Sequence, residues 1–266
     1  MKKLFPKSSR YVLLALASFT FVFSAQLAGG AGWGSKVLSI FNQKASSSET
    51  GSAFSSAEEL AKALREALAV SAERALTQLG RKGGFSDSDT FRIPLPKAVE
   101  SFRKPLQLVK QDYLLDNFQD TMNLAAEEGV AAAPGIVKQA IQELTMEDLN
   151  QLWKGEDDAI TRFLEKRARD PLAERMLPLI ANATDSTGAT RRYKQMQSSL
   201  PDADGGLFSA VRSFAGIGGK SDFDLDTYVN EKALDGLFKA MALEEKAIRE
   251  NPLARSTDLL KKLFGN

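Results

Sequence analysis

The side chains with which this chain could do chemistry are those of aspartate, glutamate, lysine, serine, threonine and tyrosine, because it contains no histidine and no cysteine. Without cysteine it can form no disulfide, thiolate nucleophile, cysteine-bound zinc or iron–sulfur cluster. Without histidine it has no serine–histidine–aspartate triad and no imidazole base or ligand. We therefore expect no cofactor, no metal and no catalytic residue of these kinds.

Two short patterns match part of a functional motif and lack the rest of it. Residues 222–226 (DFDLD) match the first half of a calcium loop, but Thr227 and Ala233 occupy the positions that need glycine and glutamate. Ser101 and Lys104 match the Ser-x-x-Lys pattern of some hydrolases without its companion elements. Neither match predicts a site.

Adjacent acidic residues could supply paired carboxylates, which glycoside hydrolysis needs at a separation of about 5–10 Å. Neighbours on a helix point about 100° apart, so a working pair would have to join two helices. The default interpretation is charge on helix surfaces. The four adjacent pairs are Glu58/Glu59, Glu127/Glu128, Asp157/Asp158 and Glu244/Glu245.

Uncommon polar side chains gather in three segments that prolines or helical spacing hold rigid. These segments are the extended 92–96 (RIPLP), the predicted helix face in 228–238, and the turn in 249–258 around Pro252. Rigid backbone with convergent polar groups is what a binding site needs, and a buried structural network needs the same. For Arg255 we favour a structural bridge between helices. The predicted ligand-binding residues are Arg92, Tyr228, Lys232, Asp235, Arg249, Asn251, Arg255 and Asp258.

A third candidate is an apolar segment framed by glycines, 206–219 (GLFSAVRSFAGIGG). One interpretation is a flap that closes over a hydrophobic ligand or contacts a membrane. The other is a short helix packed on the body of the protein. The apolar residues of this predicted flap are Leu207, Phe208, Val211, Phe214 and Ile217.

The N-terminus is typical of a secretory signal peptide. Four basic residues precede the apolar run 11–23, and small residues follow it. We predict a signal peptide over 1–31. The alternative is an uncleaved inner-membrane anchor, since 25 uncharged residues separate Arg10 from Lys36 and a spanning helix needs about 20. Both interpretations export the body, to the periplasm in a Gram-negative cell.

Export also changes the charge. The whole chain carries 35 basic and 34 acidic residues, and loss of the four basic residues near the start leaves a net charge of −3. This balance predicts no nucleic-acid partner. Membrane contact is expected only through residues 11–41 or 207–217.

The elements that must position these residues are helices. Residues 32–55 combine a short apolar patch with a serine-rich linker, and we predict an all-α single domain over 56–266, a bundle of about seven to nine helices. Ser56 and Glu59 predict a capping box. Further predicted features are a helical stripe from Val99 to Val109, a helix over 159–168, a first helical position at Pro171 with a kink at Pro178, an N-cap at Asp226, and a last helix capped by Ser256 or Thr257.

Several longer segments resemble an uncharacterised bacterial family, domain of unknown function 4197. The resemblance spans nearly the whole predicted mature chain, and its last two segments are the most specific. It implies an exported helical protein and implies no catalytic or ligand-binding residue. The matching segments are 31–33 (AGW), 92–96 (RIPLP), 145–149 (TMEDL), 155–159 (GEDDA), 228–238 (YVNEKALDGLF) and 249–262 (RENPLARSTDLLKK).

Two functional hypotheses follow. The first is a non-enzymatic cell-envelope protein, a helical binding or interaction module for a hydrophobic ligand or an envelope partner. The second is a hydrolase of envelope polymers that uses Asp and Glu carboxylates. An apolar cavity would favour the first, and two carboxylates converging in an open cleft, one of them desolvated, would favour the second.

Overall fold

The computed structural model describes residues 54–145, 152, 155–198 and 223–265, and every regular element in this part of the chain is helical. The predicted all-α multi-helix fold is thus confirmed. Met1–Gly51 and Ser52–Asn266 are separate units, and the fold below is that of the second. The predicted flap 207–217 and the predicted signal peptide over 1–31 lie outside the described residues.

Helix α2 (Ala57–Leu79) begins as the capping pattern predicts and differs from it in one bond. The Ser56 hydroxyl accepts a hydrogen bond from the Glu59 amide at 3.1 Å. Glu59 does not return this bond to Ser56; its carboxylate accepts from the Ser55 amide and hydroxyl at 2.8 and 2.6 Å. At the other end, a Cβ on Gly80 would lie 2.9 Å from the Ala131 Cα, so glycine allows the close approach of the next long helix.

The predicted stripe from Val99 to Val109 forms two short helices, α3 (Lys97–Glu100) and α4 (Arg103–Leu108). Val109 departs from the predicted stripe, because the helix ends before it and its side chain is exposed. Helix α5 (Tyr113–Ala131) follows, and Pro134 starts α6 (Pro134–Gln142) at a position where its missing N–H costs nothing.

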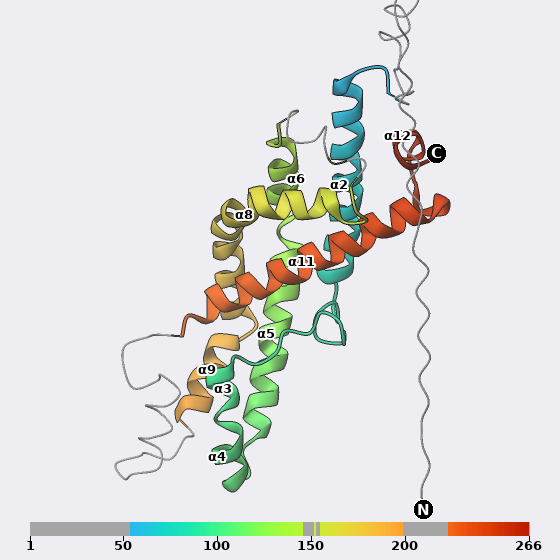
Figure 1. Cartoon of the computed structure of the whole chain (residues 1–266). Helices are drawn as coiled ribbons and strands as arrows, with labels where there is room; N and C mark the ends of the chain where they lie inside the picture. The colour runs from blue at the N-terminus through green and yellow to red at the C-terminus, as the bar shows by residue number, and fades with distance from the viewer. Residues whose placement is uncertain (1–53, 146–151, 153–154, 199–222, 266) are drawn as a thin grey trace, which may run out of the picture. The chain divides into compact units, whose positions relative to one another are not determined.

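Helix α8 (Ala159–Ser186) corrects the prediction of separate helices, since it runs through both Pro171 and Pro178 without a break in assignment. Pro171 is therefore not a first helical position. The helix changes direction along its length (Figure 1), as expected for a helix with internal prolines. Helix α9 (Ala189–Ser198) continues after Gly188, whose φ of 80° suits glycine.

Helix α11 (Leu225–Glu250) is the element around which the others are arranged. It crosses α2 and α5 and packs against α8 (Figure 1). Its N-cap is Asp224, not the predicted Asp226, because the Asp224 carboxylate accepts from the amides of residues 226 and 227. The short η1 (Pro252–Ala254) and α12 (Asp258–Phe264) follow, and Thr257 caps α12 as one of the two predicted candidates.

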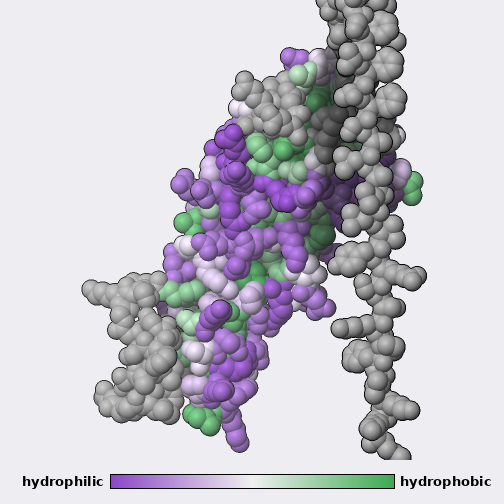
Figure 2. Space-filling model, in the orientation of Figure 1, coloured by the Kyte–Doolittle hydropathy of each residue, from purple (hydrophilic) through white to green (hydrophobic). Residues whose placement is uncertain are grey.

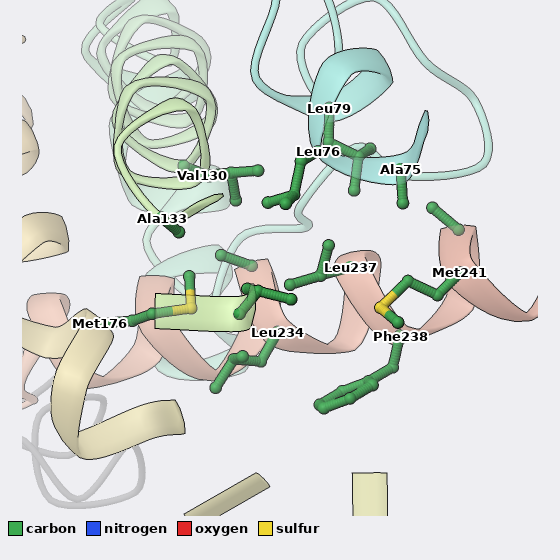
Figure 3. Packing of buried hydrophobic residues seen from close by; sticks show 14 of the residues in the cluster. Ala75, Leu76, Leu79, Val130, Ala133, Met176, Leu234, Leu237, Phe238 and Met241 are labelled. Carbon is green, nitrogen blue, oxygen red and sulfur yellow. The ribbon is translucent and has the colours of Figure 1, made fainter. Parts of the chain in front are cut away.

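The core lies where α2, α5 and α11 meet. Figure 3 shows Leu76 and Leu79 of α2, Val130 of α5 and Leu237 of α11 pointing toward one another. Leu79, Val130 and Leu237 are fully buried. Burial of such side chains stabilises a fold by about 1.5–3 kcal/mol each before entropy is counted. This core fixes α2, so its far face is also held in place.

Candidate functional site

A groove between α2 and α6 is the site best suited to a ligand. Its volume is about 820 Å³, within the range of roughly 300–1,000 Å³ that small-molecule sites occupy. On α2 its lining runs from Lys62 to Gly80, which is about 27 Å along a helix. The groove is open to solvent, and Ala131 and Pro134 line the end where α5 is followed by α6.

The floor of the groove is apolar. Ala72 and Leu76 of α2 and Val137 and Ile141 of α6 are buried, and they hold the two helices together. Ala69, about one turn before Ala72 on α2, also lines the groove and is exposed. Because Ala69 and Ala72 have the smallest apolar side chains, α2 leaves an open channel where leucine would fill it.

The rim of the groove is charged, and most of these charges have no partner. Lys62, Arg65 and Arg81 come from α2 and its end, and Lys138 comes from α6. Arg65 donates to the Leu144 carbonyl at 2.6 Å. The side chains of the other three cations form no ion pair or hydrogen bond in the part of the chain that the structure describes, and the same holds for the two rim acids, Glu66 and Glu73. Four cations against two acids leave the rim net positive.

Sequence reasoning missed this groove because its two walls are separate helices with ordinary patterns. A signal was present nonetheless. On α2 the alanines at 69 and 72 stand on one face, and 62, 65, 66, 73 and 81 carry charge beside it. Small apolar residues flanked by charge at helical spacing are consistent with a shallow groove, but only packing shows which helix forms the other wall.

The predicted polar face at 228–235 does meet the predicted loop at 92–96. The Tyr228 hydroxyl donates to the Pro94 carbonyl at 2.9 Å, and burial raises the pKa of this phenol above its usual value. The Lys232 ammonium lies 2.7 Å from the Asp235 carboxylate, which also pairs with Arg169 of α8. Burial would raise the pKa of Asp235, but bonds from Lys232 and Arg169 outweigh it and lower that pKa.

Arg92 belongs to the same region and is engaged within the protein. It pairs with Asp120 of α5 at 2.6 Å and donates to the Ser86 carbonyl. The loop that carries it is fixed by Asn123, a fully buried side chain that accepts from the Ile93 amide at 2.7 Å and donates to the Ile93 carbonyl at 3.1 Å. Sequence reasoning did not find this role of Asn123.

The predicted residues of the turn at 249–258 form a second cluster at the far end of α11. Arg255 donates to the carbonyls of Ile248 and Arg249 at 3.1 and 2.8 Å, which satisfies the end of the helix. The Asn251 side chain accepts from the Leu253 amide and starts η1. Asp258 is fully exposed and pairs only with Lys261, within the described chain.

The structure does not bring these two clusters together. Tyr228 and Arg249 stand 21 positions apart on one helix, which separates them by about 31 Å. No small ligand could be bordered by both. Whether either cluster contacts a ligand stays a prediction.

Two glutamates of the adjacent acidic pairs, Glu127 and Glu245, are buried, whereas the default interpretation placed them on helix surfaces. Glu127 is 2% exposed, and its carboxylate accepts from the amides of Gly83, Phe85 and Ser86. Glu245 is 1% exposed and accepts from the Ile160 and Thr161 amides at the start of α8 at 3.2 and 2.7 Å. Both carboxylates therefore act as buried caps for backbone amides of another segment.

The acidic cluster before α8 does not form a desolvated pair. Glu156 and Asp157 are exposed, and both pair with cations, Arg162 and Lys246 respectively. In the residues that the structure describes, no group of three or more acidic side chains could hold a metal ion, and no helix is long and apolar enough to cross a membrane.

The fold and the groove define a class of protein: an all-α chain with an apolar, cation-rimmed groove and with its buried carboxylates engaged in hydrogen bonds. The family model described as "Protein of unknown function (DUF4197)" matches residues 55–265, so the chain belongs to this family. This confirms the resemblance seen in the sequence. Neither a curated protein nor a solved structure matches the chain.

Proposed function

We propose that the protein is a non-enzymatic binding module whose groove between α2 and α6 takes an amphipathic ligand with a long apolar chain and an anionic group. The observation that carries the proposal is the combination of the apolar floor with a rim whose lysines lack partners. Unpaired cations beside an apolar channel favour an anion attached to a hydrophobic chain, because each part then contacts matching surface.

The length and openness of the groove support an extended ligand. A channel of about 27 Å suits an acyl chain lying along α2 better than a compact ring system. Cations stand at both ends, Lys62 near the start of the groove and Arg81 at its close, with Lys138 between them. The anionic group of the ligand can therefore pair with a cation at either end of the groove or at its middle.

The alternative of a carboxylate hydrolase has less support. The two buried carboxylates of the described residues, Glu127 and Glu245, each accept several hydrogen bonds and belong to different helices. Glu66 and Glu73 line the groove but stand on one face of the same helix, two turns apart, and do not oppose each other across it.

We also propose that the body acts in the cell envelope. The support is the basic start, apolar run and small-residue end of the N-terminus. A carrier or sensor of an anionic amphiphile would find such ligands there, released from the membranes on either side. Mass spectrometry of the secreted protein would test export, since the predicted mature chain starts near residue 32.

The test of binding compares two amphiphiles with the same sixteen-carbon chain and opposite head charge, palmitate and hexadecyltrimethylammonium, each below its micelle concentration. Isothermal titration calorimetry should show palmitate binding at least about tenfold more tightly, since a charge preference of ~1.4 kcal/mol gives that ratio. Equal affinity would show that the rim charges do not select the ligand.

Two variants locate the site. Ala69→Trp places a large ring on the exposed floor of the groove and should abolish palmitate binding while the protein stays folded. Ala57→Trp is the matched control, because it is also an exposed alanine of α2 and lies outside the groove. Lys138→Glu should weaken palmitate binding about tenfold and strengthen binding of the cationic amphiphile. Unchanged palmitate binding by Ala69→Trp would contradict the proposal.

A further inference from the structure

The turn between α4 and α5 carries an unusual concentration of exposed apolar side chains. Leu108 is 82% exposed, Val109 44% and Tyr113 54%, all within six residues. The other large exposed apolar residues of the described chain, such as Leu243 and Leu253, stand singly. A cluster of this kind costs solubility in a free monomer and therefore indicates a contact surface.

The backbone holds these side chains outward rigidly. The Gln111 amide donates to the Leu106 carbonyl at 2.8 Å and the Lys110 amide to the Gln107 carbonyl at 3.0 Å, which is the Schellman ending of a helix. Buried Leu106 and Leu114 anchor the turn on both sides. The exposure of Leu108 and Val109 is thus a property of a fixed turn.

Lys110 stands where this ending normally has glycine. Its φ is 56°, and it is the only residue other than glycine with positive φ in the described chain. The left-handed region is unfavourable for a lysine, so the local sequence keeps a cationic side chain at a conformational cost. This lysine follows Leu108 and Val109 directly in the chain, and its side chain is exposed like theirs.

The charges around the turn are net positive once internal pairs are removed. Glu100 and Asp116 are both bound to Arg103, at 2.5 and 3.3 Å. Lys97, Lys104 and Lys110 are all exposed, and none of them forms an ion pair in the described chain. Asp112 is the one acid of residues 97–116 that remains without a cation.

Helix α9 adds basic residues on the same side. The rings of Tyr193 and Phe118 lie 5.5 Å apart, which places α9 against α5 about 8 Å along the helix from Tyr113. The segment from 189 to 198 has three basic residues, Arg191, Arg192 and Lys194, and no acid. Helices α3, α4, α9 and the start of α5 gather at one end of the body (Figure 1).

We infer that this end of the body, the α4–α5 tip, docks on an anionic lipid bilayer, a contact outside the segments 11–41 and 207–217 where the sequence predicts one. Leu108, Val109 and Tyr113 enter the boundary between head groups and acyl chains, and the lysines at 97, 104 and 110 contact lipid phosphates. Apolar residues beside unpaired cations, with a tyrosine at the edge, match the layered chemistry of a membrane interface. The tip lies near one end of α5 and the groove near the other, about 27 Å apart.

The absence of cysteine makes the tip testable in the full chain, because one introduced cysteine is the sole labelling site. Leu108→Cys carries an environment-sensitive dye, and Leu253→Cys is the matched control, since that leucine is 93% exposed and lies far along the chain on η1. The vesicles contain equal parts of phosphatidylglycerol and phosphatidylethanolamine, with brominated acyl chains as quenchers. Pure phosphatidylcholine vesicles of the same size serve as the neutral comparison.

The dye at position 108 should be quenched in the anionic vesicles and little in the neutral ones, and the dye at position 253 in neither. Lys104→Glu with Lys110→Glu should weaken the quenching titration about tenfold, as should raised salt. Binding of the whole protein through its N-terminus would quench neither position selectively. Equal quenching at 108 and 253, or quenching at 108 that needs no anionic lipid, would overturn the inference, as would dimerisation that buries position 108 without lipid.

Discussion

The groove between α2 and α6 and the turn at the end of α11 are both rich in charge, and they use it in opposite ways. In the turn, Arg255 donates to two backbone carbonyls, and Arg249 lies 2.9 Å from buried Glu245. In the groove, Lys62 and Lys138 stand without partners over an apolar floor. The dense polar cluster in the turn therefore forms a structural network, and the unpaired charge lies beside the apolar surface where we propose that a ligand binds.

The face of the molecule in Figure 2 illustrates the same contrast on a larger scale. Hydrophilic residues dominate its middle, where α8 and α11 cross the other helices, and hydrophobic areas show between them. Charged residues of α8 and α11 pair with one another, as Arg169 does with Glu165 and Asp235. Exposed pairs of this kind contribute about 0–1 kcal/mol each, so their number says little about stability.

The largest effect that separates the two regions should come from Glu245. Glu245→Gln replaces the carboxylate that accepts from the Thr161 amide and hydroxyl, both at 2.7 Å, and breaks the ion pair of buried Glu245 with Arg249. Breaking one partner of a buried pair costs about 3–5 kcal/mol. Urea denaturation should show this loss of unfolding free energy.

The control is its neighbour. Glu244→Gln breaks a pair with Arg74 whose side chains are about 30% exposed, and should cost at most about 1 kcal/mol. If the two variants lose the same stability, the turn is not a buried network and the contrast with the groove fails.

A smaller effect is expected at Arg255. Arg255→Lys keeps the charge but cannot reach both the Ile248 and Arg249 carbonyls with a planar fork, and the loss should be about 1–3 kcal/mol. Palmitate binding in the groove should not change. A variant with native stability and weakened palmitate binding would restore Arg255 as a ligand contact.

The smallest effect concerns pH. Bonds from Lys262 and Ser55 lower the pKa of Glu59 from 4.5 to about 2. A lowered pKa in the folded state means that this pairing stabilises the protein above about pH 4.5 and that the contribution disappears as pH falls toward 2. In Glu59→Gln the free energy of unfolding should therefore fall less between pH 4.5 and 2 than it does in the native chain.

Glu66→Gln on the same helix serves as the reference for this measurement, since Glu66 has no partner in the described chain. Thermal melts across the window would compare the two variants with the native chain. If Glu59→Gln loses stability between pH 4.5 and 2 to the same extent as the native chain, the pair of Glu59 with Lys262 is not formed in solution.

Local pattern was sufficient to predict much of the fold. The cap at Ser56, the helix over 228–238 and the cap at Thr257 follow from helical periodicity and from side chains that bond within three residues. The errors were local too. Asp224 in place of Asp226 at the start of α11 reflects a boundary shift of two residues, and α8 continued through Pro171 because tertiary contacts with α5 and α11 hold it.

The sequence by itself determined that the protein is helical, that it has no histidine or cysteine chemistry, and where the helices α2 and α12 begin. Only the tertiary structure decided which charges are buried and where a groove opens. Glu245 accepts a hydrogen bond from Thr161, 84 residues away in the sequence. Helix α6 forms the second wall of the groove that α2 lines. The physical reason is range: a helix forms from bonds within one turn, whereas burial depends on which distant helix packs against each face.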